Sequence, residues 1–406
     1  MDALDALDPD ALARDAAAIV RVPSVTGDER PALAALADLA REAGLGADLH
    51  AHDLAALRAH PDHPGEERPR DELWGLTVTL PGSAPGRIAL NGHVDVVGPG
   101  TVPWRHGPWS GAVEDGRLYG RGSVDMKGAV VAMLHALAAL RAAGATTPEV
   151  VLQCVSSEED GGLGTFAELE LDAAFDAALI GEPTGFDVIC AHAGALTFRC
   201  VIPGRTAHAA HRLEGCSAID RYVRVHAALA DLERRINDGV EHPLMRELEL
   251  PYPLLVGRVS GGDWPSQVPD RVELDGRLGV PVGIDAAAAR AEVEAAVAAA
   301  LDDGEAPAEI SWTGGAYLPA ETPVDHPWAR RVGEAVSAER GGPARVAGVP
   351  WGADMRLFGA RGIPCVMAGP SGIERAHAVD EWVAVDELVA LARIVVRVLL
   401  SAAAER

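Results

Sequence analysis

The chain has 406 residues, of which 48% are hydrophobic and 23% are charged, and its formal net charge at pH 7 is −25. This length exceeds one ordinary hydrophobic core and predicts two or three globular domains. The negative charge argues against nucleic acid and anionic membrane surfaces as partners, because both require a basic footprint on the protein. No apolar run approaches the roughly 20 residues of a membrane helix. We therefore expect neither nucleic acid nor a membrane as a partner.

The beginning of the chain is acidic and lacks the basic and apolar regions of a secretory signal peptide. The five cysteines show no CxxC or paired spacing, which favours reduced thiols of a cytoplasmic protein over disulfides or a thiolate metal site. These cysteines are Cys154, Cys190, Cys200, Cys216 and Cys365.

The first half of the chain predicts an alternation of helices and strands. Apolar residues recur at helical spacing over 11–21 and 30–43, and a polar, turn-rich loop is expected at 60–71. The predicted elements that follow are strand 74–80, strand 87–91, helix 128–143, strand 149–155, helix 166–171 and strand 177–180. Such an alternation predicts an α/β sheet with helices on both faces, where ligands lie beyond the carboxyl ends of the strands.

The pattern changes near residue 192. The elements predicted there are strand 195–202, helix 218–236, strands 254–260 and 271–280, helix 286–301 and strand 308–312. This β-α-β-β-α-β order is the ferredoxin-like split pattern, which predicts a small α+β domain at 193–315 inserted into a catalytic domain formed by 1–192 and 316–406. Helix 327–339, strand 364–367 and helix 385–400 complete the α/β domain.

Two histidine-containing motifs could contribute metal ligands. His93 and Asp95 follow a strand at an i, i+2 spacing, so both side chains point the same way, and a neutral imidazole beside a carboxylate is a good zinc ligand. A surface His–Asp pair is the alternative. His377 stands late in the chain in a glycine-rich loop after a strand, where a structural histidine is also common.

Four carboxylates complete the candidate set. Asp125, in a glycine-rich loop before a helix, could bridge two cations or could cap that helix. Glu158 and Glu159 are adjacent at a strand end, so one could bind metal while the other acts as a general base. Glu182 ends another apolar strand. Each acid could also be a solvated loop residue, but five motifs in this order together predict a two-metal site for hydrolysis.

These motifs, with the segment Trp104–Tyr119, resemble the M20 metallopeptidase family over nearly the whole chain. That family holds acetylornithine deacetylase, succinyl-diaminopimelate desuccinylase, aminoacylases, and di- and tripeptidases. The resemblance implies a three-layer α/β catalytic domain with a zinc-peptidase-like mixed sheet, and an inserted ferredoxin-like lid and dimerisation domain.

The resemblance also implies a role for each motif residue. His93 and Glu182 would bind one zinc ion, Glu159 and His377 the other, and Asp125 would bridge both, with a cis peptide before Met126. Cobalt or manganese could substitute for zinc. Asp95 would orient His93. Glu158 would be the general base that takes a proton from the bridging water and returns it to the leaving amine.

The inserted domain carries the residues that the resemblance assigns to the substrate. His208, in Gly204–His208, would reach across a homodimer to the substrate carbonyl as an oxyanion donor. The loop 266–270 reads Ser-Gln-Val-Pro-Asp and lacks the asparagine usual in the family. Arg277 and Arg356 are candidates to clamp a substrate carboxylate, and each could equally be a structural ion pair.

We therefore expect a cytoplasmic, homodimeric, metal-dependent hydrolase of C–N bonds. A deacylase of the acetylornithine or succinyl-diaminopimelate type leads, because Glu182 is a glutamate where many aminopeptidases of the family carry an aspartate. A di- or tripeptidase or carboxypeptidase follows, then a formyl- or carbamoyl-amine hydrolase. A catalytically silent relative that binds small molecules is the alternative from another class, but its signature, loss of Glu158 or a metal ligand, is missing from this sequence.

Overall fold

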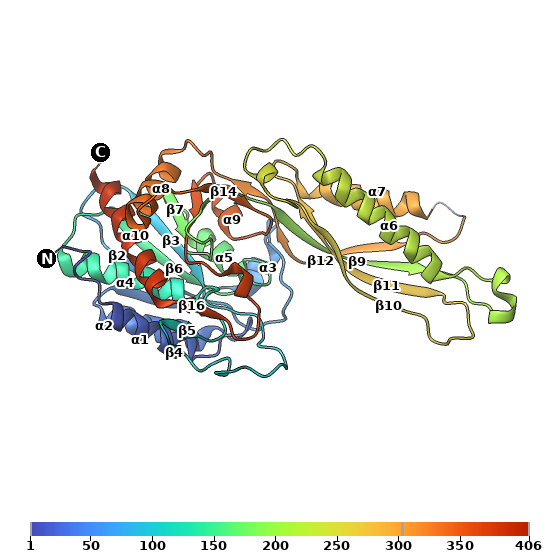
Figure 1. The fold of residues 1–406 in the computed structure, drawn as a ribbon, viewed down its shortest axis with the longest axis horizontal. Helices are drawn as coiled ribbons and strands as arrows, with labels where there is room; N and C mark the ends of the chain where they lie inside the picture. The colour runs from blue at the N-terminus through green and yellow to red at the C-terminus, as the bar shows by residue number, and fades with distance from the viewer. Residues whose placement is uncertain (1, 302–303, 405–406) are drawn as a thin grey trace. The chain divides into compact units, whose positions relative to one another are not determined.

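The computed structural model describes residues 2–301 and 304–404, which form two compact units (Figure 1). The first unit contains the described residues up to Cys190, Glu321–Ala347 and those from Ala353 onward. The second unit contains the described part of Ala191–Ala320 and the short segment Gly348–Gly352. Among the described residues no helix is long and apolar enough to cross a membrane.

A mixed sheet forms the centre of the first unit. Its strands, in spatial order, are β1 (Gly46–Ala51), β2 (Trp74–Leu80), β6 (Glu149–Val155), β3 (Arg87–His93), β7 (Ala177–Ile180), β15 (Cys365–Met367), β8 (Val188–His192) and β13 (Ala320–Glu321), and β14 (Val346–Val349) also pairs with β8. Strand β3 runs parallel to β6 and β7, whereas β1, β2 and β6 are antiparallel neighbours. The carboxyl ends of β3, β6 and β7 therefore meet at one edge of the sheet.

Helices cover both faces of this sheet, which confirms the predicted three-layer α/β fold (Figure 1). Gly92 and Asn91 are neighbours on β3 and so point to opposite faces. A Cβ on Gly92 would lie 2.8 Å from Val130 of α4 (Lys127–Ala143), whereas Asn91 donates a hydrogen bond to Thr165 of α5 (Leu163–Leu171). The helices on the α4 face, which contact one another, are α1 (Pro9–Val20), α4 (Lys127–Ala143), α8 (Pro327–Arg340) and α10 (Val385–Ala404), while α5 (Leu163–Leu171) packs with α9 (Met355–Gly359).

The remaining elements of the first unit are short or peripheral. They are α2 (Arg30–Glu42), α3 (Leu54–Ala59) and a three-stranded sheet of β16 (Trp382–Ala384), β5 (Arg117–Tyr119) and β4 (Ala112–Glu114). Local chemistry sets the helix ends as expected. The Asp8 carboxylate caps α1 by accepting hydrogen bonds from the N–H groups of Asp10 and Ala11, and Gly144 ends α4 with a φ of 60°.

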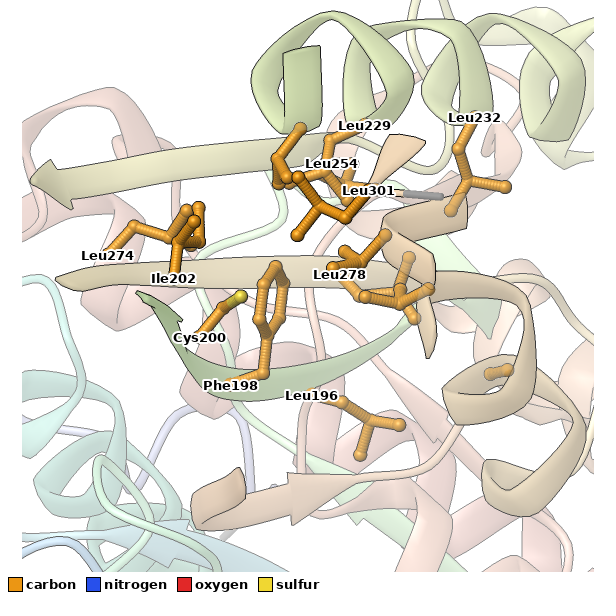
Figure 2. Close-up of a cluster of buried hydrophobic side chains, with 14 of the residues drawn as sticks. Leu196, Phe198, Cys200, Ile202, Leu229, Leu232, Leu254, Leu274, Leu278 and Leu301 are labelled. Carbon is orange, nitrogen blue, oxygen red and sulfur yellow. The ribbon is translucent and has the colours of Figure 1, made fainter. Parts of the chain in front are cut away.

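The second unit is a four-stranded antiparallel sheet with two helices. Its elements in chain order are β9 (Gly194–Pro203), α6 (Ala218–Asn237), β10 (Leu254–Gly261), β11 (Arg271–Val280), α7 (Ala286–Ala300) and β12 (Glu309–Tyr317). The spatial order β10-β11-β9-β12 is that of the ferredoxin-like pattern. Alternate side chains of β9 and β11, such as Phe198 and Leu274, join Leu229 and Leu232 of α6 in a buried core (Figure 2).

Most predicted elements are present with ends shifted by a few residues, and the differences have local causes. Strand β12 extends to Tyr317 rather than ending at Trp312, because a bulge between Thr313 and Ala316 places Gly314 at a φ of 74° and lets the strand continue. The sequence did not reveal β1, whose strand carries partly exposed residues on both faces and no continuous apolar run.

Candidate metal centre

His93 closes strand β3, so the sheet fixes its backbone. Its side chain is buried, and Nδ1 lies 2.8 Å from the backbone carbonyl oxygen of Asp95. A carbonyl oxygen can only accept, so Nδ1 donates the hydrogen, and the lone pair of the neutral ring is on Nε2. This is the tautomer that a histidine needs in order to bind a metal through Nε2.

The Asp125 carboxylate lies between two histidines. Its Oδ1 is 3.0 Å from Nε2 of His93, and its Oδ2 is 3.4 Å from Nε2 of His377. The Asp125–Met126 peptide bond is cis, as the family resemblance implied. Each carboxylate oxygen of Asp125 thus faces a different imidazole, which is the arrangement of a bridging ligand.

Two glutamates complete two groups of potential ligands around Asp125. Glu182 follows β7, and its Oε1 is 3.9 Å from Nε2 of His93. Glu159 follows β6, and both of its oxygens lie 3.1 Å from Nε2 of His377. In each group, His93–Asp125–Glu182 and Asp125–Glu159–His377, the ligand atoms lie within 4.8 Å of one another.

The electrostatics of the centre favour a cation. Burial lowers the pKa of His93, but the hydrogen bond to Asp125 and the charge of Glu182 raise it well above its usual range. Hydrogen bonds to Asp125 and Glu159 raise the pKa of His377 to about 10, and burial raises the pKa of Glu182 to about 8. These raised pKa values indicate that positive charge at this centre stabilises the buried carboxylates.

The donor set fits two divalent transition-metal ions. Two ligand atoms bound to one zinc ion at about 2.0–2.2 Å stand a little over 3 Å apart, close to the separations of the Asp125 oxygens from the two imidazoles. Imidazole nitrogen and carboxylate oxygen are ligands that suit zinc. The five residues predicted as ligands are therefore brought together in a geometry that could hold two ions through a shared carboxylate.

Glu158 lies beside this cluster, next in the chain to Glu159. Its side chain is buried, and burial together with the charge of Asp354 raises its pKa well above the ordinary range. A carboxylate with a raised pKa can accept a proton and release it again near neutral pH, which suits a general base.

Sequence comparison assigns this arrangement to a family. Residues 89–401 match the profile of Peptidase family M20/M25/M40. The chain belongs to the M20 family. The match begins in β3 and ends in α10, so it includes every residue of the two ligand groups.

Individual relatives and solved structures agree with this assignment. The chain is 33% identical over 246 residues to a succinyl-diaminopimelate desuccinylase of Methylobacterium radiotolerans (58% of this chain, 59% of that protein), and 31% identical over 202 residues to an acetylornithine deacetylase of Photorhabdus laumondii (50% and 51%). These matches thus span a little over half the length of the curated relatives.

Solved M20 structures share the fold over nearly the whole chain. The aminopeptidase PepT from Bacillus cereus has a TM-score of 0.75 at 20% identity, covering 98% of this chain and 100% of its own. The M20 metallo-carboxypeptidase Sso-CP2 from Sulfolobus solfataricus has a TM-score of 0.76 at 16% identity, covering 95% and 97%. At these identities the likeness shows the fold alone.

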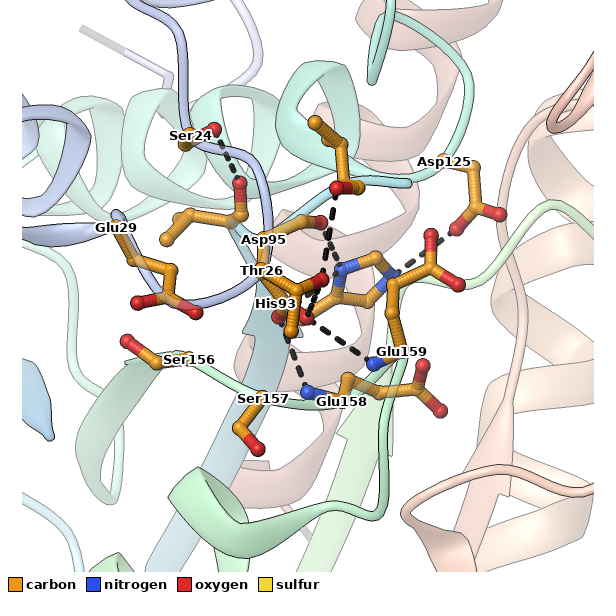
Figure 3. Close-up of polar contacts among 12 residues, drawn as sticks. Ser24, Thr26, Glu29, His93, Asp95, Asp125, Ser156, Ser157, Glu158 and Glu159 are labelled. Atoms are coloured by element: carbon orange, nitrogen blue, oxygen red, sulfur yellow. Dashed lines mark hydrogen bonds and ion pairs between the residues drawn. The ribbon is translucent and has the colours of Figure 1, made fainter. Parts of the chain in front are cut away.

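Asp95 holds the loop of Glu158 and Glu159 in this M20 chain (Figure 3). Its Oδ1 accepts a hydrogen bond of 3.0 Å from the N–H of Glu158, and its Oδ2 accepts one of 3.1 Å from the N–H of Glu159. Its carboxylate is 3.7 Å from Nδ1 of His93, so the shorter contact to that ring comes from the Asp95 carbonyl. The structure therefore adds a second task to the predicted orientation of His93.

A buried ion pair that the sequence did not reveal also anchors the Glu158–Glu159 loop. Arg70 Nη2 donates to both carboxylate oxygens of Asp160, at 2.9 and 2.8 Å, and Arg70 Nη1 lies 3.4 Å from Glu29. Ser157 also donates to Asp160 and has a φ of 65°, a strained value for serine. Because Arg70 lies at the end of the polar stretch predicted as a surface loop, its spacing gave no signal of burial.

A second ion pair anchors the Asp125 loop. Arg121 Nη1 donates to Glu381 Oε2 at 2.6 Å, and Glu381 Oε1 accepts from the N–H groups of Val124 and Asp125 at 3.0 and 3.3 Å. Arg121 Nη2 donates to the carbonyl oxygen of His377 at 3.1 Å. The pair thus positions both a bridging ligand and a terminal ligand of the candidate centre. The sequence alone did not reveal this pair, because its two members lie 260 residues apart.

Arg356, one of the predicted substrate-binding residues, is buried in the first unit. Its Nη2 donates to the carbonyl oxygen of Gly161 at 2.7 Å, and its Nη1 donates to that of Ala353 at 3.1 Å. It also lies 3.4 Å from Asp354 Oδ1. These contacts bind the guanidinium to protein acceptors and favour a structural role for Arg356, which joins α9 to Gly161 in the loop that follows Glu158.

His208 and Arg277 belong to the second unit. His208 is exposed, and its Nδ1 accepts a hydrogen bond of 3.1 Å from the N–H of Ala210. Arg277 lies on β11, opposite Thr197 of β9, and burial lowers the pKa of its guanidinium. Among the described residues no carboxylate forms an ion pair with Arg277, whereas Arg199 on the same sheet pairs with Asp275 at 2.8 Å.

Proposed function

We propose that the chain is a dinuclear-metal amidohydrolase that cleaves the amide bond of an N-acyl amino acid or a related small amide. The observation that carries this proposal is the position of Asp125, whose two oxygens face His93 and His377 separately, with Glu159 and Glu182 completing two ligand groups. The buried Glu158 beside them supplies the group that a hydrolase needs to move a proton.

Two divalent ions bound there would polarise the amide carbonyl and lower the pKa of a water. Glu158 takes a proton from the attacking water as its oxygen bonds to the carbonyl carbon, and then gives that proton to the amine nitrogen as the C–N bond breaks. Asp95 holds the backbone of Glu158 during both transfers through the 3.0 Å hydrogen bond to its N–H. The products are a carboxylate and an amine.

Among the possible activities, deacylation of an N-acyl amino acid is the leading candidate. The desuccinylase and the deacetylase, at 33% and 31% identity, support it more strongly than the peptidases, whose structures are 20% identical or less. A peptidase is the second candidate, and a formyl- or carbamoyl-amine hydrolase is third.

Arg277 is our candidate for the substrate carboxylate. A partly buried guanidinium without a carboxylate partner among the described residues of its unit is costly to keep, unless a ligand supplies the missing anion. We expect Arg277→Met to raise KM for an N-acyl amino acid at least tenfold with a smaller change in kcat. The matched variant Arg199→Met, which removes an exposed ion pair on the same sheet, should leave KM unchanged.

We further propose that two copies of the chain associate through the second unit and that His208 then acts on the substrate of the partner copy. Large hydrophobic side chains are exposed in this unit, including Leu213 (94% exposed), Val223 (60%) and Trp264 (67%), as expected of a surface that another chain covers. A fully active monomer at working concentration would contradict the role of His208 across subunits.

The five free cysteines are consistent with the predicted cytoplasmic location.

The experiment that tests the function is a substrate panel. The purified chain, loaded with zinc or cobalt, is assayed against N-acetyl, N-succinyl, N-formyl and N-carbamoyl amino acids and against dipeptides. We expect release of the amine to be fastest from an N-acetyl or N-succinyl amino acid and to be lost after treatment with a chelator. Faster cleavage of the dipeptides would make the chain a peptidase, and no turnover of any member would support a silent relative.

A further inference from the structure

A second cluster of metal-ligating side chains lies in the first unit, and it shares no residue with the candidate metal centre. His50 lies on β1 and His52 directly follows its last residue, where the N–H of His52 still donates to the carbonyl oxygen of Leu73, so the two rings project from the same face of this extended segment. Glu168 reaches them from α5, and its Oε1 is 3.0 Å from Nε2 of His50 and 3.2 Å from Nε2 of His52. The three ligand atoms lie within 4.8 Å of one another.

The hydrogen bonding of His50 leaves a conflict that a cation resolves. Nδ1 of His50 lies 3.2 Å from the backbone carbonyl oxygen of Asp48, which can only accept, so Nδ1 carries the hydrogen. Nε2 of a neutral ring then presents a lone pair, yet it stands 3.0 Å from a carboxylate oxygen, another acceptor. Nε2 is buried and has no hydrogen-bond partner among the described residues, so its contact with Glu168 lacks the direction of a hydrogen bond.

Nε2 of His52 lies within hydrogen-bonding distance, 3.2 Å, of the same Glu168 oxygen, so the two Nε2 atoms and Oε1 face one shared position. Ligands of a metal ion converge in this way, because each lone pair points at the ion and not at the neighbouring ligand. The Nδ1 contact with a backbone carbonyl is the outer hydrogen bond that metal-binding histidines usually make.

The fold leaves space for this cluster at Gly75, which lies opposite His50 on the neighbouring strand β2. A Cβ at this position would lie 1.9 Å from Glu168 Oε1 and 2.7 Å from His52 Nε2. Any other residue at position 75 would displace the carboxylate from the histidines. The side chains of His52 and Glu168 are 3% exposed, whereas that of His50 is 20% exposed and offers a path to solvent.

We propose that His50, His52 and Glu168 bind a divalent transition-metal ion of the zinc class, separate from the two ions of the candidate metal centre. Two imidazole nitrogens and one carboxylate oxygen are a ligand set that zinc uses, with a water completing four-coordination. The ion would fasten β1, which lies at the edge of the sheet, to α5, the helix that follows the Glu158–Glu159 loop.

A proton is the competitor of this ion. The carboxylate of Glu168, 3.0 Å away, raises the pKa of His50, so a protonated ring can neutralise the same carboxylate. Metal binding must then release that proton, which makes the affinity rise with pH. Metal analysis distinguishes the two alternatives, because a bound ion adds to the metal content of the chain whereas a protonated histidine binds no ion.

The test is the number of zinc ions that the full chain retains, measured by elemental analysis after the chelator-stripped protein is dialysed against micromolar zinc at pH 7.5. We expect His50→Gln and Glu168→Gln each to retain one ion fewer than the wild type. His60→Gln is the matched control and should retain the wild-type number, because His60 faces Glu170 of the same helix at 3.5 Å but belongs to none of the three-residue ligand groups found among the described residues. The difference between variants, and not the total, carries the result, so a failure of the proposed two-metal site would not alter it.

A second measurement removes the dependence on variants that fold poorly. In the wild-type chain with ¹⁵N-labelled histidines, zinc should move the Nε2 signals of His50 and His52 together in one saturable step, while the signal of His60 stays in place. Equal metal content in the wild type, His50→Gln and Glu168→Gln would overturn the proposal. An Nε2 signal of His50 that shows a protonated ring and does not respond to zinc would also overturn it.

Discussion

Arg121 and Glu381 form a buried ion pair, with Nη1 of the arginine 2.6 Å from Oε2 of the glutamate and both side chains at most 3% exposed. The remaining atoms of the pair hold the backbone at two ligands of the candidate metal centre, because Glu381 accepts from the N–H of Asp125 and Arg121 donates to the carbonyl of His377. An outer pair that orients ligands in this way commonly governs metal affinity.

Replacement of Glu381 by glutamine should weaken metal binding by about 10–100-fold. The amide keeps an oxygen for the N–H of Val124, but Arg121 becomes a buried cation without its partner, which typically destabilises a fold by about 3–5 kcal/mol. Competition with a chromophoric chelator measures the affinity, and thermal unfolding measures the stability. The control is Glu374→Gln, which removes an exposed ion pair with Arg375 and should change neither quantity. Wild-type zinc affinity in Glu381→Gln would refute the positioning role.

The Asp95 carboxylate makes a second prediction, about turnover. In Asp95→Asn one carboxylate oxygen becomes an NH₂ group, which cannot accept from a backbone N–H, so either Glu158 or Glu159 loses its anchor. We expect kcat to fall by about 10–100-fold, because the base or a ligand then moves away from its working position. Thr26→Val is the matched control, since it removes the 3.1 Å hydrogen bond to Asp95 Oδ2 and leaves both N–H contacts in place. Equal losses in the two variants would show that the backbone contacts do not matter.

The buried amine of Lys127 should make the stability of the fold depend on pH. Its Nζ is buried 2.9 Å from the carbonyl oxygen of Val22, and burial lowers the pKa of its amine from 10.5 to about 7. Between about pH 7 and 10 the unfolded chain therefore holds a proton on Lys127 that the folded chain has released, so the contribution of Lys127 to stability rises with pH and falls below pH 10 towards pH 7.

The difference in unfolding free energy between the wild type and Lys127→Met should therefore shift in favour of the wild type as the pH rises. This difference in unfolding free energy can change by at most about 1.4 kcal/mol per pH unit. Urea denaturation of the metal-free proteins at several values between pH 7 and 9.5 measures it, and other titrating groups cancel in the difference. A difference that stays flat, or that moves against the wild type, would show that the lysine is charged in the folded chain.

Much of the fold could be predicted from the sequence, because long periodic segments dominate both units. The helices α4 and α6 and the strands β6 and β11 carry enough apolar periodicity to fix their type within a few residues of their ends. The strand β1 and the short α9 could not be found in this way, since packing against the rest of the sheet defines them rather than their own pattern.

The candidate ligands could be predicted for a different reason. His93, Glu159 and Glu182 follow parallel or neighbouring strands, whose carboxyl ends meet at one edge of the sheet. The outer residues have no such local signature. Arg70 meets Asp160 from 90 residues away, and Arg121 meets Glu381 from 260 residues away, so these pairs exist only after the chain has folded.

The claim that Glu158 moves the proton in a two-metal hydrolase is tested most directly by Glu158→Gln, which keeps the shape of the side chain and removes its basicity. Zinc content and kcat are measured together on the best substrate of the panel. We expect the variant to retain the zinc of the wild type while kcat falls by at least about 10²-fold. A variant that binds the same zinc and keeps a tenth or more of the wild-type kcat would contradict it.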